Sequence, residues 1–267
     1  MKRVCCFFST FAILSLIAAQ KELPDFGKID PADLRMKTCS FESSANAMKL
    51  FDVQEIEFEP NDYSSKLRTE RRVRIKIFNE KGYKYASVRI PYFSKKRSTK
   101  IKELRGVIYN LDAEGNVITE KLEKKDFFKE KAEDNIGIIN FTFPNLKPGS
   151  VIEFSYTKIE KNIIQIDPWV AQADIPTAYA STVLITPGFS RVKEKILGAD
   201  SIEQRSERLT KFNYARNKKT YFKENIVSFQ PEPFMSSSKD NLMKVIFFLI
   251  PETNFFIDAL TSPESIW

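Results

Sequence analysis

The chain has 267 residues, with 42 lysine and arginine side chains against 35 aspartate and glutamate side chains, and it contains no histidine. Without an imidazole it cannot form a Ser-His-Asp triad or a Cys-His pair, which excludes the commonest hydrolase centres. The surplus of positive charge is modest, and its densest cluster (residues 94–102) holds no aromatic residue on which bases could stack, so we expect no nucleic-acid partner.

Residues 1–19 are predicted to be a signal peptide. Positive charge at Lys2 and Arg3 precedes Val4–Ala19, an uncharged and mostly apolar run that ends in small residues. This order is typical of secretory signal peptides, and the run is shorter than the roughly 20 residues that span a bilayer. We therefore expect an extracytoplasmic mature chain, whether periplasmic, outer-membrane-associated or secreted.

Cysteine usage predicts no disulfide in the mature chain. Cys5 and Cys6 leave with the signal peptide, so only Cys39 remains, and we expect it to be a small, partly buried hydrophobic residue. One cysteine without histidine cannot supply the usual zinc ligands. Glycine-rich nucleotide loops and a G-x-S-x-G motif are also absent from the sequence. The sequence therefore predicts no catalytic, cofactor-binding or metal-binding residue.

Residues 20–50 are predicted to form an N-terminal segment with short helices. Asp30 can cap a helix, Pro31 suits its first turn, and Asp33 favours its positive end. A second short helix is expected over residues 43–51.

From residue 51 to 252 the sequence predicts a β-sandwich domain, with a sub-boundary near 188. The clearest strand alternates between charged and apolar residues: Arg72, Val73, Arg74, Ile75, Lys76 and Ile77. Because neighbouring side chains on a strand point to opposite faces, we expect one apolar face and one charged, solvated face.

The next elements are expected to be short strands joined by turns. Residues 79–82 predict a turn, and residues 85–93 a returning strand, which Pro91 bends or places at an edge. A further strand over 104–110 is followed by a hairpin loop at 112–116. The charged run at 120–135 is expected to be a mobile, solvated connection with a helical turn.

The stretch FTFPNLKPGSVIEFSY, residues 141–156, predicts a hairpin around a type II turn at Pro148-Gly149. In its second strand Ile152 and Phe154 are apolar, so alternation points Glu153 to the opposite side, which we expect to face water.

Later segments complete the prediction of an all-β protein. Residues 167–188 carry spaced prolines that suit strand ends and corners, and the apolar residues 245–251 predict a buried strand. Residues 253–267 are predicted to begin a linker or helix. We predict a large antiparallel β-sandwich, built as one unit or as two packed halves, with a few short helices.

Three segments in order resemble a bacterial family of secreted or envelope proteins of unknown function. They are LDAEGNVI at 111–118, FTFPNLKPGSVIEFSYT at 141–157 and PWVAQADIPTAYASTVLITP at 168–187. The positions that carry the resemblance are Phe143, Pro144, Pro148, Gly149, Ser150, Glu153, Trp169, Gln172, Ile175, Pro176 and Pro187.

In that family a β-rich N-terminal domain precedes a transglutaminase-like domain that carries a Cys-His-Asp triad. The resemblance implies a sandwich without catalytic residues, and a transglutaminase-like or cysteine-peptidase-like partner in cis or in trans. The chain ends at Trp267, about where a linker to such a partner would begin. Both a natural short form and a fragment of a longer protein fit the resemblance.

Three functions follow as hypotheses. The first is a non-catalytic domain that binds or scaffolds, with a transglutaminase-like domain, an envelope protein or a glycan as partner. The second is a carboxylate-dependent glycan hydrolase, although 35 acids always supply some suitable pair. The third is a membrane-surface module that uses the basic face of Arg72, Arg74 and Lys76.

Overall fold

A computed structural model describes residues 21–59, 66–94, 98–133, 135–161, 165–188, 190–198, 201–211, 214–231 and 237–250. The predicted signal peptide (1–19) and the predicted linker or helix (253–267) lie outside the described residues. None of the helices within those ranges has the length and apolar character that a membrane crossing requires.

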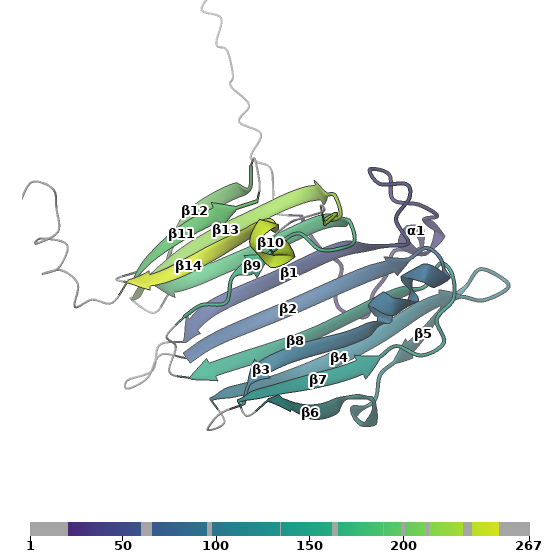
Figure 1. Ribbon diagram of the computed structural model, residues 1–267, viewed down its shortest axis with the longest axis horizontal. Helices are drawn as coiled ribbons and strands as arrows, with labels where there is room; N and C mark the ends of the chain where they lie inside the picture. The colour runs from purple at the N-terminus through teal and green to yellow at the C-terminus, as the bar shows by residue number, and fades with distance from the viewer. Residues whose placement is uncertain are drawn as a thin grey trace, which may run out of the picture.

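An eight-stranded sheet forms the centre of the molecule, in the order β12-β13-β10-β1-β2-β8-β4-β5 (Figure 1). Its strands are β1 (Ala47–Glu59), β2 (Lys66–Ile77), β4 (Thr99–Leu111), β5 (Val117–Lys121), β8 (Val151–Lys161), β10 (Thr177–Pro187), β12 (Glu203–Lys211) and β13 (Tyr214–Ile226). The strands on both sides of position 188 thus belong to one sheet.

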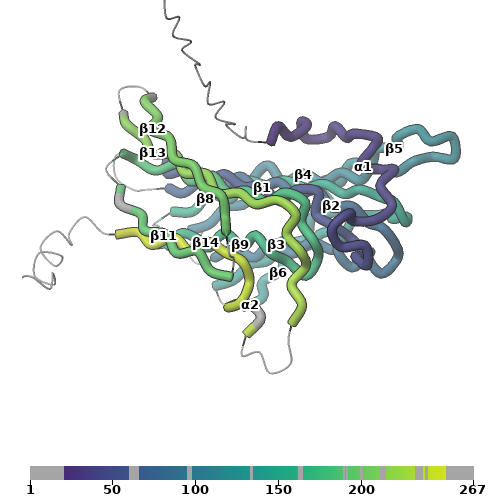
Figure 2. The backbone as a smooth tube through the Cα atoms, turned by 90° about the horizontal axis from the view of Figure 1, so that it is seen from above, coloured from purple at the N-terminus to yellow at the C-terminus, as the bar shows by residue number. Residues whose placement is uncertain are grey.

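Two three-stranded sheets lie over one face of this large sheet (Figure 2). One has the order β11-β14-β9, from β9 (Trp169–Val170), β11 (Arg191–Leu197) and β14 (Lys244–Ile250). The other has the order β3-β7-β6, from β3 (Ser87–Phe93), β6 (Phe128–Glu133) and β7 (Ile136–Thr142). The short helices are α1 (Pro31–Arg35), η1 (Glu80–Ala86), η3 (Lys124–Asp126) and α2 (Ser238–Asn241).

Each small sheet closes its own apolar core against the large one. Ile56, Leu184 and Tyr221 of the large sheet pack with Trp169 and Phe247 of the β11-β14-β9 sheet. The second core joins other residues of the large sheet, among them Val73, Ile152 and Phe154, to Ile90, Ile139 and Phe141 of the β3-β7-β6 sheet. The predicted all-β fold is confirmed, and its two halves share one sheet.

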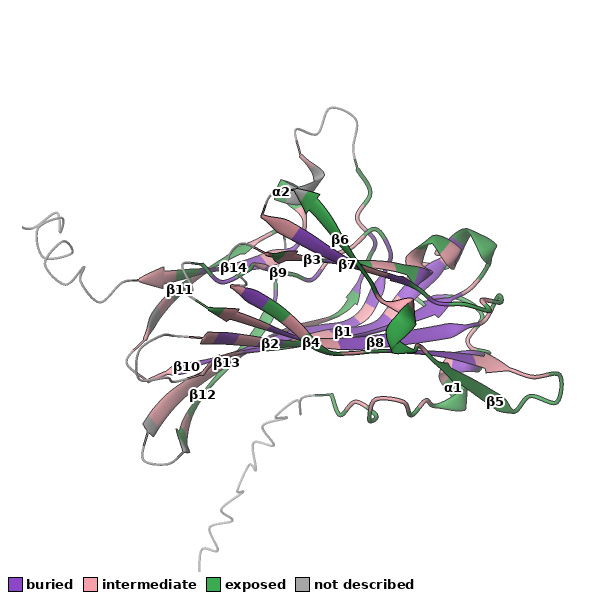
Figure 3. Cartoon of the chain, turned by 90° about the horizontal axis from the view of Figure 1, so that it is seen from below, coloured by how far each residue is buried: buried purple, intermediate pink, exposed green. Residues whose placement is uncertain are grey.

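The opposite face of the large sheet is covered at one end by residues 21–46, which we call the N-terminal cover (Figures 2 and 3). Leu34 of α1 and Cys39 pack there against Phe51, Tyr109 and other buried sheet residues. Cys39 is free and only 1% exposed, so it is more deeply buried than the sequence predicts. The α1 cap is confirmed, because the Ala32 amide donates to Asp30 Oδ1 at 2.8 Å.

Two local predictions are corrected by strand pairing. Residues 43–51 do not form a helix, because β1 begins at Ala47 and pairs with β2 on one side and β10 on the other. The sheet is not wholly antiparallel, since β1 and β10 run parallel. The chain passes through both small sheets between these two strands, so no hairpin constrains their relative direction.

The connections after β2 also differ from the prediction. The turn at 79–82 is the start of η1, and β3 pairs with β7 in a small sheet instead of returning beside β2. Pro91 does lie in an edge strand, as predicted. The run at 120–135 contains the expected helical turn, η3, but residues Phe128–Glu133 form β6 instead of a loop.

The segment 141–156 is not a hairpin. β7 belongs to a small sheet and β8 to the large one, so the chain crosses between layers at this point. Phe141 and Phe154 meet across the two layers, with ring centroids 5.7 Å apart. The predicted turn itself is confirmed: the Ser150 amide donates to Lys147 O at 2.9 Å, and Gly149 has a φ of 96°.

We expect Gly149→Ala to lower the free energy of unfolding by about 1 kcal/mol, because a β-carbon disfavours this left-handed backbone. Space is not the cause, since an added Cβ would meet nothing closer than Lys76 Nζ at 3.9 Å. Urea denaturation measures the change. Gly149→Asn serves as the control, because asparagine tolerates positive φ and should lose less. Equal losses in both variants would contradict the backbone explanation.

Candidate functional site

The predicted solvated basic face is wrong. The side chain of Arg74 is 1% exposed and that of Lys76 is 0% exposed, because the N-terminal cover lies over them. Lys76 Nζ donates to Leu34 O at 2.7 Å and to Gly149 O at 2.6 Å, and burial lowers its pKa to about 8. In this arrangement neither side chain can reach a membrane surface.

Glu153 is also buried, at 0% exposure, where the sequence predicts contact with water. Alternation did place it on the face opposite Ile152 and Phe154, but this face is covered. Its oxygens accept from Arg72 Nε at 2.5 Å, Arg74 Nη2 at 3.1 Å, Tyr109 Oη at 2.8 Å and the Gly27 amide at 3.4 Å. Burial, and then the Glu153 charge, raise the pKa of Tyr109.

This network anchors the N-terminal cover to the sheet. Arg74 pairs with Asp33 of α1 at 3.3 Å and donates to Lys28 O at 2.5 Å. The ring of Phe26 lies beneath the guanidinium groups of Arg72 and Arg105, at 5.8 and 4.3 Å from the centroid. With its oxygens engaged by four donors, Glu153 has a structural role, and a substrate has no free approach to it.

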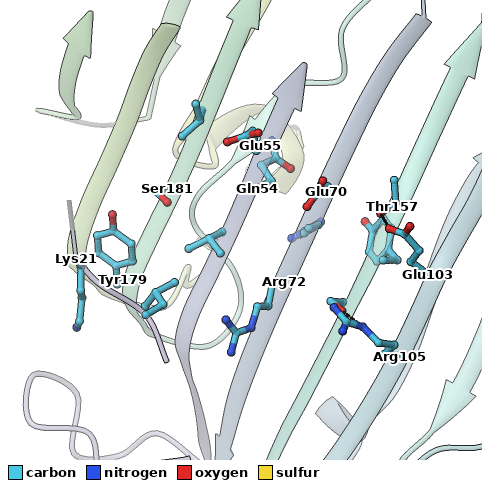
Figure 4. Close-up of a pocket in the computed structure, with 16 residues that line it drawn as sticks. Lys21, Gln54, Glu55, Glu70, Arg72, Glu103, Arg105, Thr157, Tyr179 and Ser181 are labelled. Atoms are coloured by element: carbon cyan, nitrogen blue, oxygen red, sulfur yellow. Dashed lines mark hydrogen bonds between the residues drawn. The ribbon is translucent and has the colours of Figure 1, made fainter. Parts of the chain in front are cut away.

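Beyond Arg72 the same face of the sheet is open and forms a pocket of about 300 Å³. We call this pocket the charged floor. It extends over β10, β1, β2, β8 and β4 (Figure 4), and Lys21 and Leu23 of the N-terminal cover also line it.

Strand register arranges the residues of the charged floor in two parallel rows. The first row crosses the five strands through Ser181, Val53, Arg72, Ser155 and Arg105. The second row contains Val183, Glu55, Glu70 and Thr157, and it ends at Glu103 of β4. The rows lie two residues apart along the strands, which is about 7 Å.

The two rows carry opposite charges. Arg72 and Arg105 lie at one end of the floor, and Glu55, Glu70 and Glu103 lie at the other end (Figure 4). Lys21 stands beside Tyr179 at the β10 side, across the floor from Arg105 (Figure 4). The charged floor is therefore polarised along the strand direction.

A β-bulge shapes one side of the charged floor. The register of β4 against β8 shifts between Lys102 and Arg105, and Glu103 there has a φ of 51°, in the left-handed region. Its carboxylate accepts from Thr157 Oγ1 at 2.6 Å. Bulges and left-handed residues of this kind concentrate near functional sites, where they redirect a side chain.

Several charges of the floor have no ionic partner among the described residues: Lys21, Glu55, Glu103 and Arg105. Arg105 donates through Nε to Ser155 Oγ at 3.2 Å, which leaves its other nitrogens unused by any ion pair in those ranges. Partial burial, and then the nearby Glu57 and Glu70, raise the pKa of Glu55. By contrast, Glu70 pairs with Arg68, and Arg72 with Glu153.

Sequence reasoning singled out Arg72 and missed the rest of the charged floor. Its residues come from segments up to 162 positions apart, between Lys21 and Val183. No spacing rule in the sequence links strands whose pairing is unknown. In the described part of the chain, no group of three or more Cys, Asp or Glu side chains is placed to hold a metal ion.

Residues 64–211 match the family described as a domain of unknown function with a solved structure (DUF3857). This segment includes β2, β8, β4 and β10, which form most of the charged floor. A search of the curated proteins found no match.

A solved structure shares this fold. A crystal structure from Parabacteroides distasonis ATCC 8503, described as a "putative protease", superposes with a TM-score of 0.62 at 12% identity. The match covers 77% of this chain and 41% of that protein, so this chain spans well under half its length. A "putative nutrient binding protein" from Legionella pneumophila subsp. pneumophila strain Philadelphia 1 gives a TM-score of 0.35 at 7% identity, over 76% and 67% of the two chains.

Proposed function

The chain belongs to the DUF3857 family of domains of unknown function, and on that premise we propose that it is a non-catalytic, extracytoplasmic β-sandwich that binds ligands beside a catalytic partner domain. The partner is a transglutaminase-like or cysteine-peptidase-like domain, in cis or in trans. The extracytoplasmic location rests on the predicted signal peptide at 1–19.

One observation carries this proposal. The shared fold occupies 77% of this chain but 41% of the P. distasonis protein, which is described as a "putative protease". In that protein the fold is one part of a longer chain. Since the present chain has no histidine, a Cys-His-Asp triad would have to come from another domain, and this one would position or supply its substrate.

The charged floor supports binding better than glycan hydrolysis. Glu55 and Glu70 stand opposite each other on neighbouring strands, so their β-carbons lie about 5 Å apart. A glycosidase places its two carboxyl groups on either side of the scissile bond. Here both rise from the same floor, and Arg68 holds Glu70 in an ion pair.

Two measurements test the proposal. Either the reading frame beyond the Trp267 codon or a neighbouring gene should encode a domain with a Cys-His-Asp triad. If the frame continues, the two domains belong to one polypeptide. If the triad domain is a separate protein, it should co-elute with this chain in gel filtration after both are purified. The absence of any such domain would contradict the accessory role. The glycan-hydrolase hypothesis would instead be supported if this chain alone turned over an envelope glycan. That activity would have to be lost in Glu55→Gln and kept in Glu114→Gln.

A further inference from the structure

We propose that the charged floor binds a short peptide of two or three residues through its free α-ammonium and α-carboxylate groups. This names the ligand class for the binding role above and rests on that proposed function. The carboxylate lies at the end with Arg105, and the ammonium lies at the end with Glu55.

The charges of the floor that have no ionic partner are of both signs, so they favour a ligand that carries one positive and one negative group. Within the described residues, Lys21 and Arg105 lack an ionic partner, as do Glu55 and Glu103. A simple anion would leave the acids unmatched, and a simple cation would leave the guanidinium and ammonium groups unmatched. A ligand group that stands beside a protein charge of its own sign weakens binding. A ligand with one positive and one negative end therefore complements the floor best.

The spacing of the rows fits a short peptide. The rows of opposite charge lie about 7 Å apart, and an extended chain advances about 3.3–3.6 Å per residue. Glu55 on β1 and Ser155 on β8, to which Arg105 donates, also lie two strands apart, which adds about 10 Å across the strands. A dipeptide or tripeptide that lies diagonally across the floor therefore brings its two ends towards the two rows, and the Glu55 side chain reaches over part of this distance. The pocket volume of about 300 Å³ is at the small end of the usual range for small-molecule sites.

The middle of the floor offers the contacts that a peptide backbone and small side chains need. Ser155, Thr157 and Ser181 present hydroxyl groups, and Val53 and Val183 present apolar surface. A guanidinium is suited to bind a carboxylate with two parallel hydrogen bonds. Arg105 is held for this by the Ser155 bond and by its stacking on Phe26, 4.3 Å from the ring centroid.

Calorimetric titration of the mature chain at low salt tests the proposal with four probes: Ala-Ala, N-acetyl-Ala-Ala, Ala-Ala-amide and sodium acetate. Ala-Ala should bind, and blocking either end should weaken binding about tenfold or more, because one row then loses its partner. Acetate alone should bind far more weakly than Ala-Ala.

Two variants assign the ends. Glu55→Gln should remove the preference for the free ammonium and keep the preference for the free carboxylate, while Arg105→Gln should do the reverse. Glu114→Gln, in the exposed hairpin loop, should keep both preferences. Each preference is a ratio measured within one variant, so partial loss of folded protein does not imitate it.

Equal binding of all three peptides, or no binding of Ala-Ala at millimolar concentration, would overturn the peptide site. That failure is separable from the accessory role, because co-elution with the triad domain would persist. Conversely, loss of co-elution with intact peptide selectivity would leave the site standing and remove only the partner.

Discussion

Glu153→Gln is expected to lower the free energy of unfolding by about 3–5 kcal/mol, the usual cost of breaking a buried ion pair from one side. The neutral amide cannot compensate the charge of Arg74, which is 1% exposed, or that of Arg72, which lies 2.5 Å from the carboxylate. Small domains are stable by only about 5–15 kcal/mol, so the loss should be visible as a large fall in the urea midpoint.

The same variant should loosen the N-terminal cover before the sheet unfolds. Glu153 accepts from the Gly27 amide, and Arg74 holds Asp33 and Lys28 O, so these attachments weaken together. Hydrogen exchange should therefore accelerate in residues 25–36 more than in β1 or β10. Glu114→Gln is the control and should change stability by less than about 0.5 kcal/mol. A similarly small effect of Glu153→Gln would show that the network contributes nothing to stability.

Asp52→Asn is expected to cost a comparable 3–5 kcal/mol at neutral pH. Asp52 is 3% exposed and accepts from Arg71 Nε and Nη2 at 2.9 and 2.8 Å and from Lys49 Nζ at 2.7 Å. Along β2, Arg71 stands between Leu67 of one apolar core and Val73 of the other. This ion pair thus forms a polar seam where the two sandwich halves meet.

The cost of Asp52→Asn should depend on pH with a defined sign. Burial opposes ionisation, but Arg71 and Lys49 hold the pKa of Asp52 well below its usual range. A depressed carboxyl pKa stabilises the fold above the unfolded value of about 3.9, and this contribution is lost as pH falls towards the folded value. Urea denaturation at pH 7, 5, 4 and 3 should show wild type and variant converging below about pH 4. A difference that stays constant across this range would contradict the electrostatic origin.

Local chemistry made several elements predictable. Asp30 and Pro31 start α1, the alternation from Arg72 to Ile77 marks β2, and Gly149 adopts the positive φ that its turn needs. These signals act between near neighbours in the chain, so they do not depend on the tertiary structure. They also sufficed for the all-β class.

Partner choice between strands was not predictable by the same means. A hairpin and a crossing between layers need similar turn residues, which is why 141–156 resembled a hairpin although β7 and β8 lie in different sheets. Residues 43–51 contain helix-compatible side chains, but pairing with β2 and β10 on both sides imposes a strand. Long-range hydrogen bonding overrides weak local propensity in such cases.

The sequence by itself determined the β class, the lack of histidine chemistry, and the side of each strand on which a residue such as Glu153 stands. Only the tertiary structure decided what covers that side, because burial depends on a segment more than a hundred residues away, near Gly27. It likewise decided that Lys21, Glu55, Glu103 and Arg105 share one pocket. Alternation is a local property of the backbone, whereas the meeting of charges across five strands depends on the order in which those strands pair.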